Sequence, residues 1–143
     1  MISLDIEYIP TSDLLGDRRN ARTHSDRQVG QIARSIEQFG FNNPILIDDE
    51  RTVVAGHGRL AAAQRLNIVE VPTIRLSHLS PAQRRAYMIA DNRIAELSGW
   101  DREILALEFR DLVEMDLDFE LSDTGFEIGE IDLLLEAGPD PND

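Results

Sequence analysis

The stretch Val53–Leu66, VVAGHGRLAAAQRL, combines a short β-branched run, a glycine turn and a helix-forming segment. The β-branched run ends at Gly56, and a helix is expected directly after it, with His57 and Arg59 in its first turn. The first backbone N–H groups of a helix have no partner within the helix, and together with the helix dipole they favour anions. Gly56 lets the backbone approach a ligand closely, and an arginine can bind two phosphate oxygens at once. The stretch therefore predicts an anion-binding corner, with an ordinary strand–helix turn as the alternative.

The composition is typical of a globular domain. The chain has 143 residues, of which 42% are hydrophobic, which suits one domain of ordinary size with a core. There is no cysteine, which excludes disulfides and thiolate chemistry. No apolar run reaches the roughly 18 residues that a membrane span needs, and the N-terminus does not have the pattern of a signal peptide. We therefore expect a cytoplasmic protein that makes no membrane contact.

The net charge of −13 is unevenly distributed along the chain. All 14 basic residues are arginines, and the last of them is Arg110. Up to that residue 14 basic side chains face 15 acidic ones, whereas the remainder carries 12 acidic residues and no basic one. An overall acidic chain is not typical of a strong autonomous DNA binder, although a local group of arginines can still bind phosphate.

Helix and strand signals alternate along the first hundred residues. A capping box, with Ser25 as N-cap and Gln28 three residues later, predicts a helix over 26–39. Ser80 and Gln83 predict the same start for a helix over 81–97. The other expected elements are strands over 6–10, 45–48, 52–55 and 69–76, of which the second and third form a hairpin, and three helices. These helices span 57–66, the residues after the N-cap Asp101 to about Met115, and 126–137. This order indicates an α+β fold, a small mixed β-sheet packed with helices, followed by a helical acidic C-terminal segment. The expected divisions are 1–97, 98–137 and a linker-like tail over 138–143.

The helix over 81–97 carries an apolar and a polar pattern. Its apolar face is expected to comprise Ala82, Ala86, Ile89, Ala90 and Ile94. Asp91, Asn92 and Arg93 follow one another, so they cannot all share one face of the helix. Asp91 with Asn92 could hold a hydrated Mg²⁺ beside a phosphate, and the alternative is a polar helix face with an internal ion pair.

Two further polar stretches have both a structural and a functional explanation. Three consecutive acids, Asp48, Asp49 and Glu50, favour the tight turn of a hairpin over a metal site. The loop over 16–24 carries three arginines and His24. It is either a solvated loop or a source of arginines for a phosphate.

Several of these motifs, taken in order, resemble a known family. They are Asn20-Ala21-Arg22, Asn43-Pro44-Ile45, the stretch from Val54 to Ala62, Val71-Pro72-Thr73 and Asp91-Asn92. Over about residues 5–97 the chain resembles the N-terminal domain of ParB-type proteins, in the ParB/sulfiredoxin superfamily.

The resemblance implies a nucleotide site. In ParB proteins the glycine-turn motif binds the triphosphate of CTP, a role that would fall here to Gly56, His57, Gly58 and Arg59. A later Glu-Asn pair helps bind the phosphates and Mg²⁺, a role that would fall to Asp91 and Asn92. Arg22 would belong to the arginine loop that closes over the nucleotide.

The chain departs from the ParB pattern at three places. Gly58 stands where ParB proteins have an arginine, and Ala61 where they often have a second basic residue, so weaker triphosphate binding is implied. The sulfiredoxin branch uses a catalytic cysteine in this turn, and its absence excludes that activity. Partition proteins continue with a helix-turn-helix domain that binds DNA. Here residues 101–137 are acidic and too short for such a basic recognition module. The C-terminal part is instead similar to phage and mobile-element proteins in which the domain precedes an adenine DNA methyltransferase, although no methyltransferase motif is present here.

Three functions follow as hypotheses. The first is a nucleotide-binding regulatory module of a DNA-partition or DNA-modification protein, binding CTP or another NTP with Mg²⁺ and reaching DNA through a homodimer or a second domain; a weak NTPase activity is compatible with it. The second is a metal-dependent ParB-like nuclease that uses Asp91, Glu96 and His57. The third is an acidic interaction module over 117–137, for which the alternative is a solvated helix that closes the core.

Overall fold

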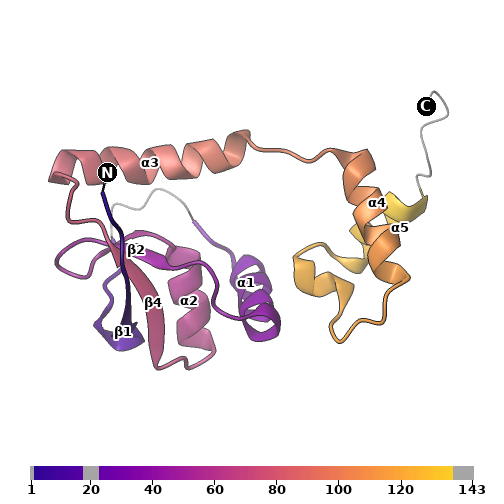
Figure 1. Cartoon of the computed structure of the whole chain (residues 1–143), viewed down its shortest axis with the longest axis horizontal. Helices are drawn as coiled ribbons and strands as arrows, with labels where there is room; N and C mark the ends of the chain where they lie inside the picture. Colours follow the sequence, from indigo (N-terminus) through magenta and orange to yellow (C-terminus); the bar gives the residue numbers. More distant parts are fainter. Residues whose placement is uncertain (1, 18–22, 137–143) are drawn as a thin grey trace. The chain divides into compact units, whose positions relative to one another are not determined.

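The computed structural model describes residues 2–17 and 23–136, and it divides the chain into two compact units, Met1–Leu97 and Ser98–Asp143 (Figure 1). Each unit has its own hydrophobic core. Within the described residues, no helix is long and apolar enough to cross a membrane. The expected tail over 138–143 lies outside the described residues.

The N-terminal unit is built on a four-stranded mixed sheet with the order β1-β4-β2-β3. The strands are β1 (Ile6–Pro10), β2 (Ile45–Ile47), β3 (Val53–Ala55) and β4 (Glu70–Arg75). β1 pairs antiparallel with β4, β4 parallel with β2, and β2 antiparallel with β3. The predicted hairpin and the α+β class are confirmed.

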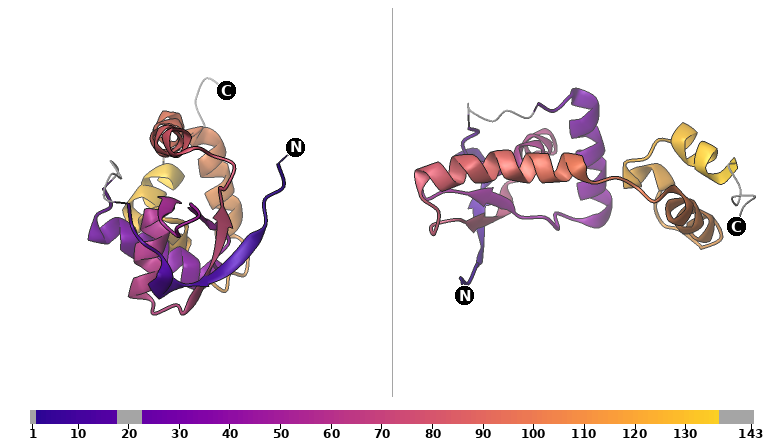
Figure 2. Two further views of the ribbon diagram at one scale, coloured as in Figure 1. Left: turned by 90° about the vertical axis from the view of Figure 1, so that its left-hand side faces the viewer. Right: turned by 90° about the horizontal axis from the view of Figure 1, so that it is seen from above.

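Three α-helices and a 3-10 turn complete this unit (Figures 1 and 2). They are η1 (Thr11–Asp13), α1 (Asp26–Phe39), α2 (His57–Arg65) and α3 (Pro81–Leu97). The sheet core consists of fully buried aliphatic side chains from all four strands, joined by Leu60 and Ala63 of α2. A second cluster, with Val29, Ala33 and Ala62 as its buried members, packs α1 against α2. The sheet and α1 together fix the position of the N-terminus of α2.

The two predicted capping boxes differ in the structure. Before α3, Ser80 and Gln83 exchange both hydrogen bonds: the Gln83 backbone N–H donates to Ser80 Oγ at 3.2 Å, and the Ser80 N–H donates to Gln83 Oε1 at 2.8 Å. Before α1, Ser25 Oγ accepts the Gln28 backbone N–H at 3.1 Å, but the Gln28 side chain lies against His24 instead. The helix bounds are as predicted in both cases.

The predicted apolar face of α3 is wrong as a core face. Met88 is the buried residue of this helix, and Arg84 and Asn92, one turn on either side, are half-buried. The predicted residues are exposed instead, with 66% of Ile89 and 65% of Ile94 accessible. Periodicity reports that a helix has an apolar stripe, but it does not tell whether the covering surface lies within the same domain.

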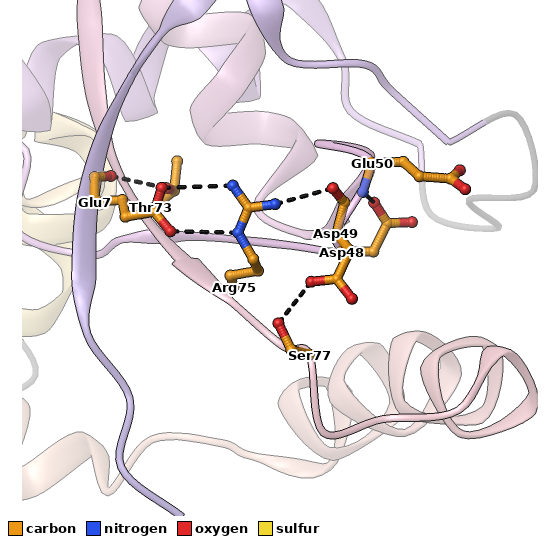
Figure 3. A network of polar contacts seen from close by, with 7 residues as sticks. All are labelled: Glu7, Asp48, Asp49, Glu50, Thr73, Arg75 and Ser77. Carbon is orange, nitrogen blue, oxygen red and sulfur yellow. Dashed lines mark hydrogen bonds and ion pairs between the residues drawn. The ribbon is translucent and has the colours of Figure 1, made fainter.

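An arginine-centred network ties the sheet to the turn after β2 (Figure 3). Arg75 Nε lies 3.3 Å from Glu7 Oε1 on β1, and Arg75 Nη1 donates to the Asp49 carbonyl at 2.9 Å. Asp48, although buried, is satisfied, because its Oδ1 accepts the backbone N–H groups of Glu50 and Thr52 at 2.9 Å each. The turn explanation for these acids is therefore confirmed.

The C-terminal unit is helical. α4 (Arg102–Val113), η2 (Leu121–Thr124) and α5 (Ile128–Glu136) enclose a small core of Ala106, Phe109, Ile131 and Leu134. Asp101 caps α4 by accepting the N–H groups of Glu103 and Ile104 at 3.1 Å. Residues 98–143 carry 15 acidic and 2 basic side chains, whereas residues 1–97 carry 12 of each, so the whole net charge resides in the C-terminal unit.

Candidate functional site

The corner between β3 and α2 is formed by Gly56. Its φ of 104° and ψ of 27° are left-handed, which turns the chain directly from the end of β3 into the first turn of α2. A Cβ at this position would lie 2.9 Å from Arg59 Nη2, so the absence of a side chain also leaves room for the arginine. The helix begins with its N–H groups at this corner, as the sequence predicts.

A cavity of about 200 Å³ opens at this corner and brings two separate sequence motifs together. Four of its lining residues, Gly56, His57, Gly58 and Arg59, come from the glycine turn. Asp91 and Asn92 of α3 line the same cavity. Six of the seven residues predicted for the site are therefore neighbours, and the seventh, Arg22, lies outside the described residues.

Arg59 is the principal cation of the cavity. Its Nη2 donates to the Pro44 carbonyl at 3.0 Å, which fixes the guanidinium. Its Nε is buried and has no hydrogen-bond partner in the described part of the chain. Burial lowers the pKa of Arg59, and the negative charge of Asp91 acts in the opposite direction, but an arginine stays charged at any physiological pH. A guanidinium fixed in this way brings a permanent positive charge to the cavity, which suits an anionic ligand.

His57 is held as a neutral imidazole. Its Nε2 lies 3.2 Å from the backbone nitrogen of Asp17 and accepts that N–H, so the ring proton is assigned to Nδ1. Burial lowers the pKa of His57, His24 lowers it further, and the carboxylate of Asp17 raises it. His57 can therefore donate one hydrogen bond from Nδ1 without carrying a charge.

His24 and Gln28 also line the cavity, and the sequence did not single them out as site residues. His24 Nδ1 lies 3.1 Å from Gln28 Oε1. The only sequence signal was indirect, because a glycine inside the first turn of a helix, such as Gly58, leaves space for a side chain from elsewhere.

The polar residues of α3 divide between the cavity and the solvent. Asp91 and Asn92 line the cavity, whereas Arg93 pairs with Glu96 at 3.2 Å along the helix. Among the residues that the structure describes, no group of three or more His, Asp or Glu side chains converges as a metal site would require. One carboxylate and one amide oxygen still fit Mg²⁺ held mainly by water and by phosphate oxygens.

Two family models match the sequence. The ParB N-terminal domain matches residues 3–93, and the ParB-methyltransferase HTH domain matches residues 103–143. The second match corrects the expectation that the acidic C-terminal part is not a helix-turn-helix module. Charge and length decide how strongly such a module can bind DNA, but they do not decide whether its helices adopt the fold.

Similar proteins support the match to the ParB N-terminal domain. The ParB-like nuclease domain-containing protein YnaK of Escherichia coli (strain K12) is 48% identical over 82 residues, which cover 57% of this chain and 94% of the relative. A probable chromosome 2-partitioning protein ParB of Deinococcus radiodurans is 32% identical over 92 residues, 62% of this chain. A nucleoid occlusion protein of Bacillus cereus (strain B4264) is 26% identical over 117 residues, 78% of this chain. The chain spans only 31% and 39% of the length of the latter two proteins.

The fold is also that of solved ParB proteins. The C-terminally truncated chromosome-partitioning protein ParB from Caulobacter crescentus, complexed with CTP-gamma-S, superposes with a TM-score of 0.79 at 24% identity, over 95% of this chain and 81% of that one. The same protein complexed to the centromeric parS site gives a TM-score of 0.51 over 94% of this chain and 73% of that one. Since the N-terminal domain model covers well over half of the sequence, the chain belongs to the ParB N-terminal domain family.

Proposed function

We propose that the cavity at the start of α2 binds the phosphates of a nucleotide, with CTP as the first candidate, and that the chain is a regulatory module of a DNA-partition or DNA-modification protein. The observation that carries the proposal is the convergence of Gly56–Arg59 with Asp91 and Asn92 on one cavity. Support for CTP comes from the ParB of similar fold that was solved with CTP-gamma-S.

Each residue of the cavity has a defined part in this proposal. The N–H groups of the first turn of α2 and the guanidinium of Arg59 bind phosphate oxygens, and Gly56 lets the phosphates approach the backbone. His57 adds a neutral donor. Asp91 and Asn92 would hold a hydrated Mg²⁺, whose chemistry is to neutralise phosphate charge. Arg22 is proposed to add a second guanidinium.

Calorimetric titration of the full chain with CTP and with ATP, each with Mg²⁺, tests the proposal. Arg59→Ala should weaken binding at least about tenfold, because a charge-assisted bidentate contact contributes roughly 1.5–3 kcal/mol. Arg65→Ala is the matched control, since Arg65 lies on the same helix but is exposed and pairs with Asp26. No heat at millimolar nucleotide would refute nucleotide binding.

DNA contact is assigned to the assembled protein and not to this chain alone. The C-terminal unit matches a helix-turn-helix model, yet its 15 acids and 2 arginines would repel the DNA backbone. We therefore propose that DNA is reached through a homodimer or through a further domain, such as a DNA methyltransferase. The exposed apolar side chains Ile89, Ile94 and Leu97 of α3 are compatible with a second copy of the chain as a partner. Light scattering with and without nucleotide measures the dimer.

A metal-dependent nuclease is the second candidate, favoured by the description of the 48% identical relative as containing a ParB-like nuclease domain. His57 and Asp91 line one cavity, whereas Glu96 lies outside its lining and pairs with Arg93. Plasmid nicking that needs Mg²⁺ or Mn²⁺ and disappears in Asp91→Ala would support this candidate. Nicking that survives the substitution would point to a contaminating enzyme.

A further inference from the structure

The space beside Gly58 is occupied by side chains of the segment that leads into α1. A Cβ built on Gly58 would lie 2.8 Å from Ile32 Cδ1 and 3.1 and 3.2 Å from His24 Cε1 and Nδ1. Gly58 is buried although it has no side chain of its own. The position in the first turn of α2 that a longer side chain would fill is therefore filled by His24, which comes from 34 residues earlier in the chain.

The Gln28 side chain fixes the orientation of His24 and does not complete the capping box of α1. Gln28 stands at the third helical position, from which its side chain would complete a capping box with Ser25, as Gln83 does with Ser80. Instead, Gln28 Oε1 lies 3.1 Å from His24 Nδ1. With the amide oxygen as acceptor, Nδ1 carries the proton, and Nε2 is the atom at which a second proton can enter.

The charges around this ring come from each of the elements that enclose the cavity. α2 contributes Arg59 and the neutral His57, α3 contributes Asp91, and the segment before α1 contributes His24 itself. Asp17 acts on His57 through its charge and its backbone N–H. Because His57 Nε2 already accepts that N–H, His24 is the histidine of the cavity that can take up a proton when an anion arrives.

We propose that His24 is a phosphate-binding residue of the cavity, which contacts phosphate in place of a side chain at position 58 and takes up a proton from solvent when phosphate binds. The inference rests on the proposed nucleotide function and deepens it. An anion in the cavity favours the imidazolium form, because an opposite charge within hydrogen-bond reach stabilises the charged state. Gln28 is a positioning residue, because it holds the ring through Nδ1.

Calorimetry of the full chain with CTP and Mg²⁺ tests the inference. Wild type should bind about three- to tenfold more tightly near pH 6 than near pH 8, and His24→Gln should lose most of this difference, since one linked proton changes affinity by at most about tenfold per pH unit. The titration of the nucleotide itself is common to both proteins and cancels in the comparison. His78→Gln is the matched control, because His78 is exposed and does not line the cavity.

A second measurement, proton uptake on binding, tests the inference even if His24→Gln perturbs folding. Binding heats in buffers of different ionisation enthalpy give the number of protons taken up, which should be above zero in wild type and His78→Gln and close to zero in His24→Gln. Gln28→Leu, which removes the positioning contact but keeps the imidazole, should reduce affinity about two- to fivefold while keeping proton uptake. CTP binding without proton uptake, or with the same pH dependence in His24→Gln, overturns the inference and leaves the nucleotide site intact. Absence of CTP binding at every pH overturns both.

Discussion

Replacing Gly56 with alanine should destabilise the N-terminal unit by about 2–3 kcal/mol. The left-handed φ of 104° costs an L-residue roughly 1–2 kcal/mol. The new Cβ would also stand 2.9 Å from Arg59 Nη2 and 3.2 Å from its Cζ, which displaces the guanidinium from its 3.0 Å hydrogen bond to the Pro44 carbonyl. A lost hydrogen bond of this kind contributes about 1 kcal/mol more.

Thermal and urea unfolding followed by far-UV circular dichroism measures this effect. For a unit of this size, each kcal/mol corresponds to about 4–8 °C, so a fall in Tm of roughly 10–20 °C is expected. Gly16→Ala is the control in the same unit, because a Cβ there meets no atom within 4 Å and the glycine has no positive φ. If the two variants differ by less than about 0.5 kcal/mol, the assignment of Gly56 as a strained turn that also makes room for Arg59 is refuted.

Three further outcomes are expected. Asp48→Ala should cost about 1–3 kcal/mol of unfolding free energy, because two backbone N–H groups lose their acceptor, whereas Glu50→Ala, at an exposed site of the same turn, should cost under about 0.5 kcal/mol. Asp101→Ala should cost about 1 kcal/mol through loss of the α4 cap, with Asp116→Ala near zero; equal values in urea unfolding would contradict the capping role. Because burial lowers the pKa of His57 in the folded chain, the unfolded chain binds this proton more tightly, and stability should fall as the pH drops below the ordinary histidine value of 6.5; His57→Gln should flatten that dependence in pH-resolved unfolding.

Short sequence patterns, such as helix caps, glycines and β-branched runs, were enough to predict most of the helices and strands. The Ser25 cap and Gly40 delimit α1 as predicted, and the β-branched run before Gly56 gave the end of β3 and the start of α2. The sheet order was beyond local reasoning. β1 pairs with β4, so that Ile6 lies opposite Ile74, and no periodicity within either strand encodes that choice.

The candidate site also has a part that the local sequence predicts and a part that it does not. The glycine turn was visible in one stretch, and its link to Asp91 and Asn92 came from a resemblance and not from spacing. His24 was not found, because its contact with Gly58 joins residues far apart in sequence and neither has a distinctive local pattern. The inward face of α3 was misjudged for the same reason: Met88, flanked by half-buried polar residues, packs inward while Ile89 and Ile94 stay exposed.

The pairing of β1 with β4 also sets the order in which the N-terminal unit can form. Ile9, from the first ten residues, is buried in the core only when Val71 has arrived opposite it. The chain between β1 and β4 must lose conformational entropy before the contacts between the two strands stabilise the unit, so this unit should fold slowly for its size. The α4–α5 pair is built from residues closer together in the sequence and should form early. On the ribosome, the glycine corner would emerge before β4, which completes its sheet, and before α3, which lines the cavity, so the cavity would remain unformed until both have emerged.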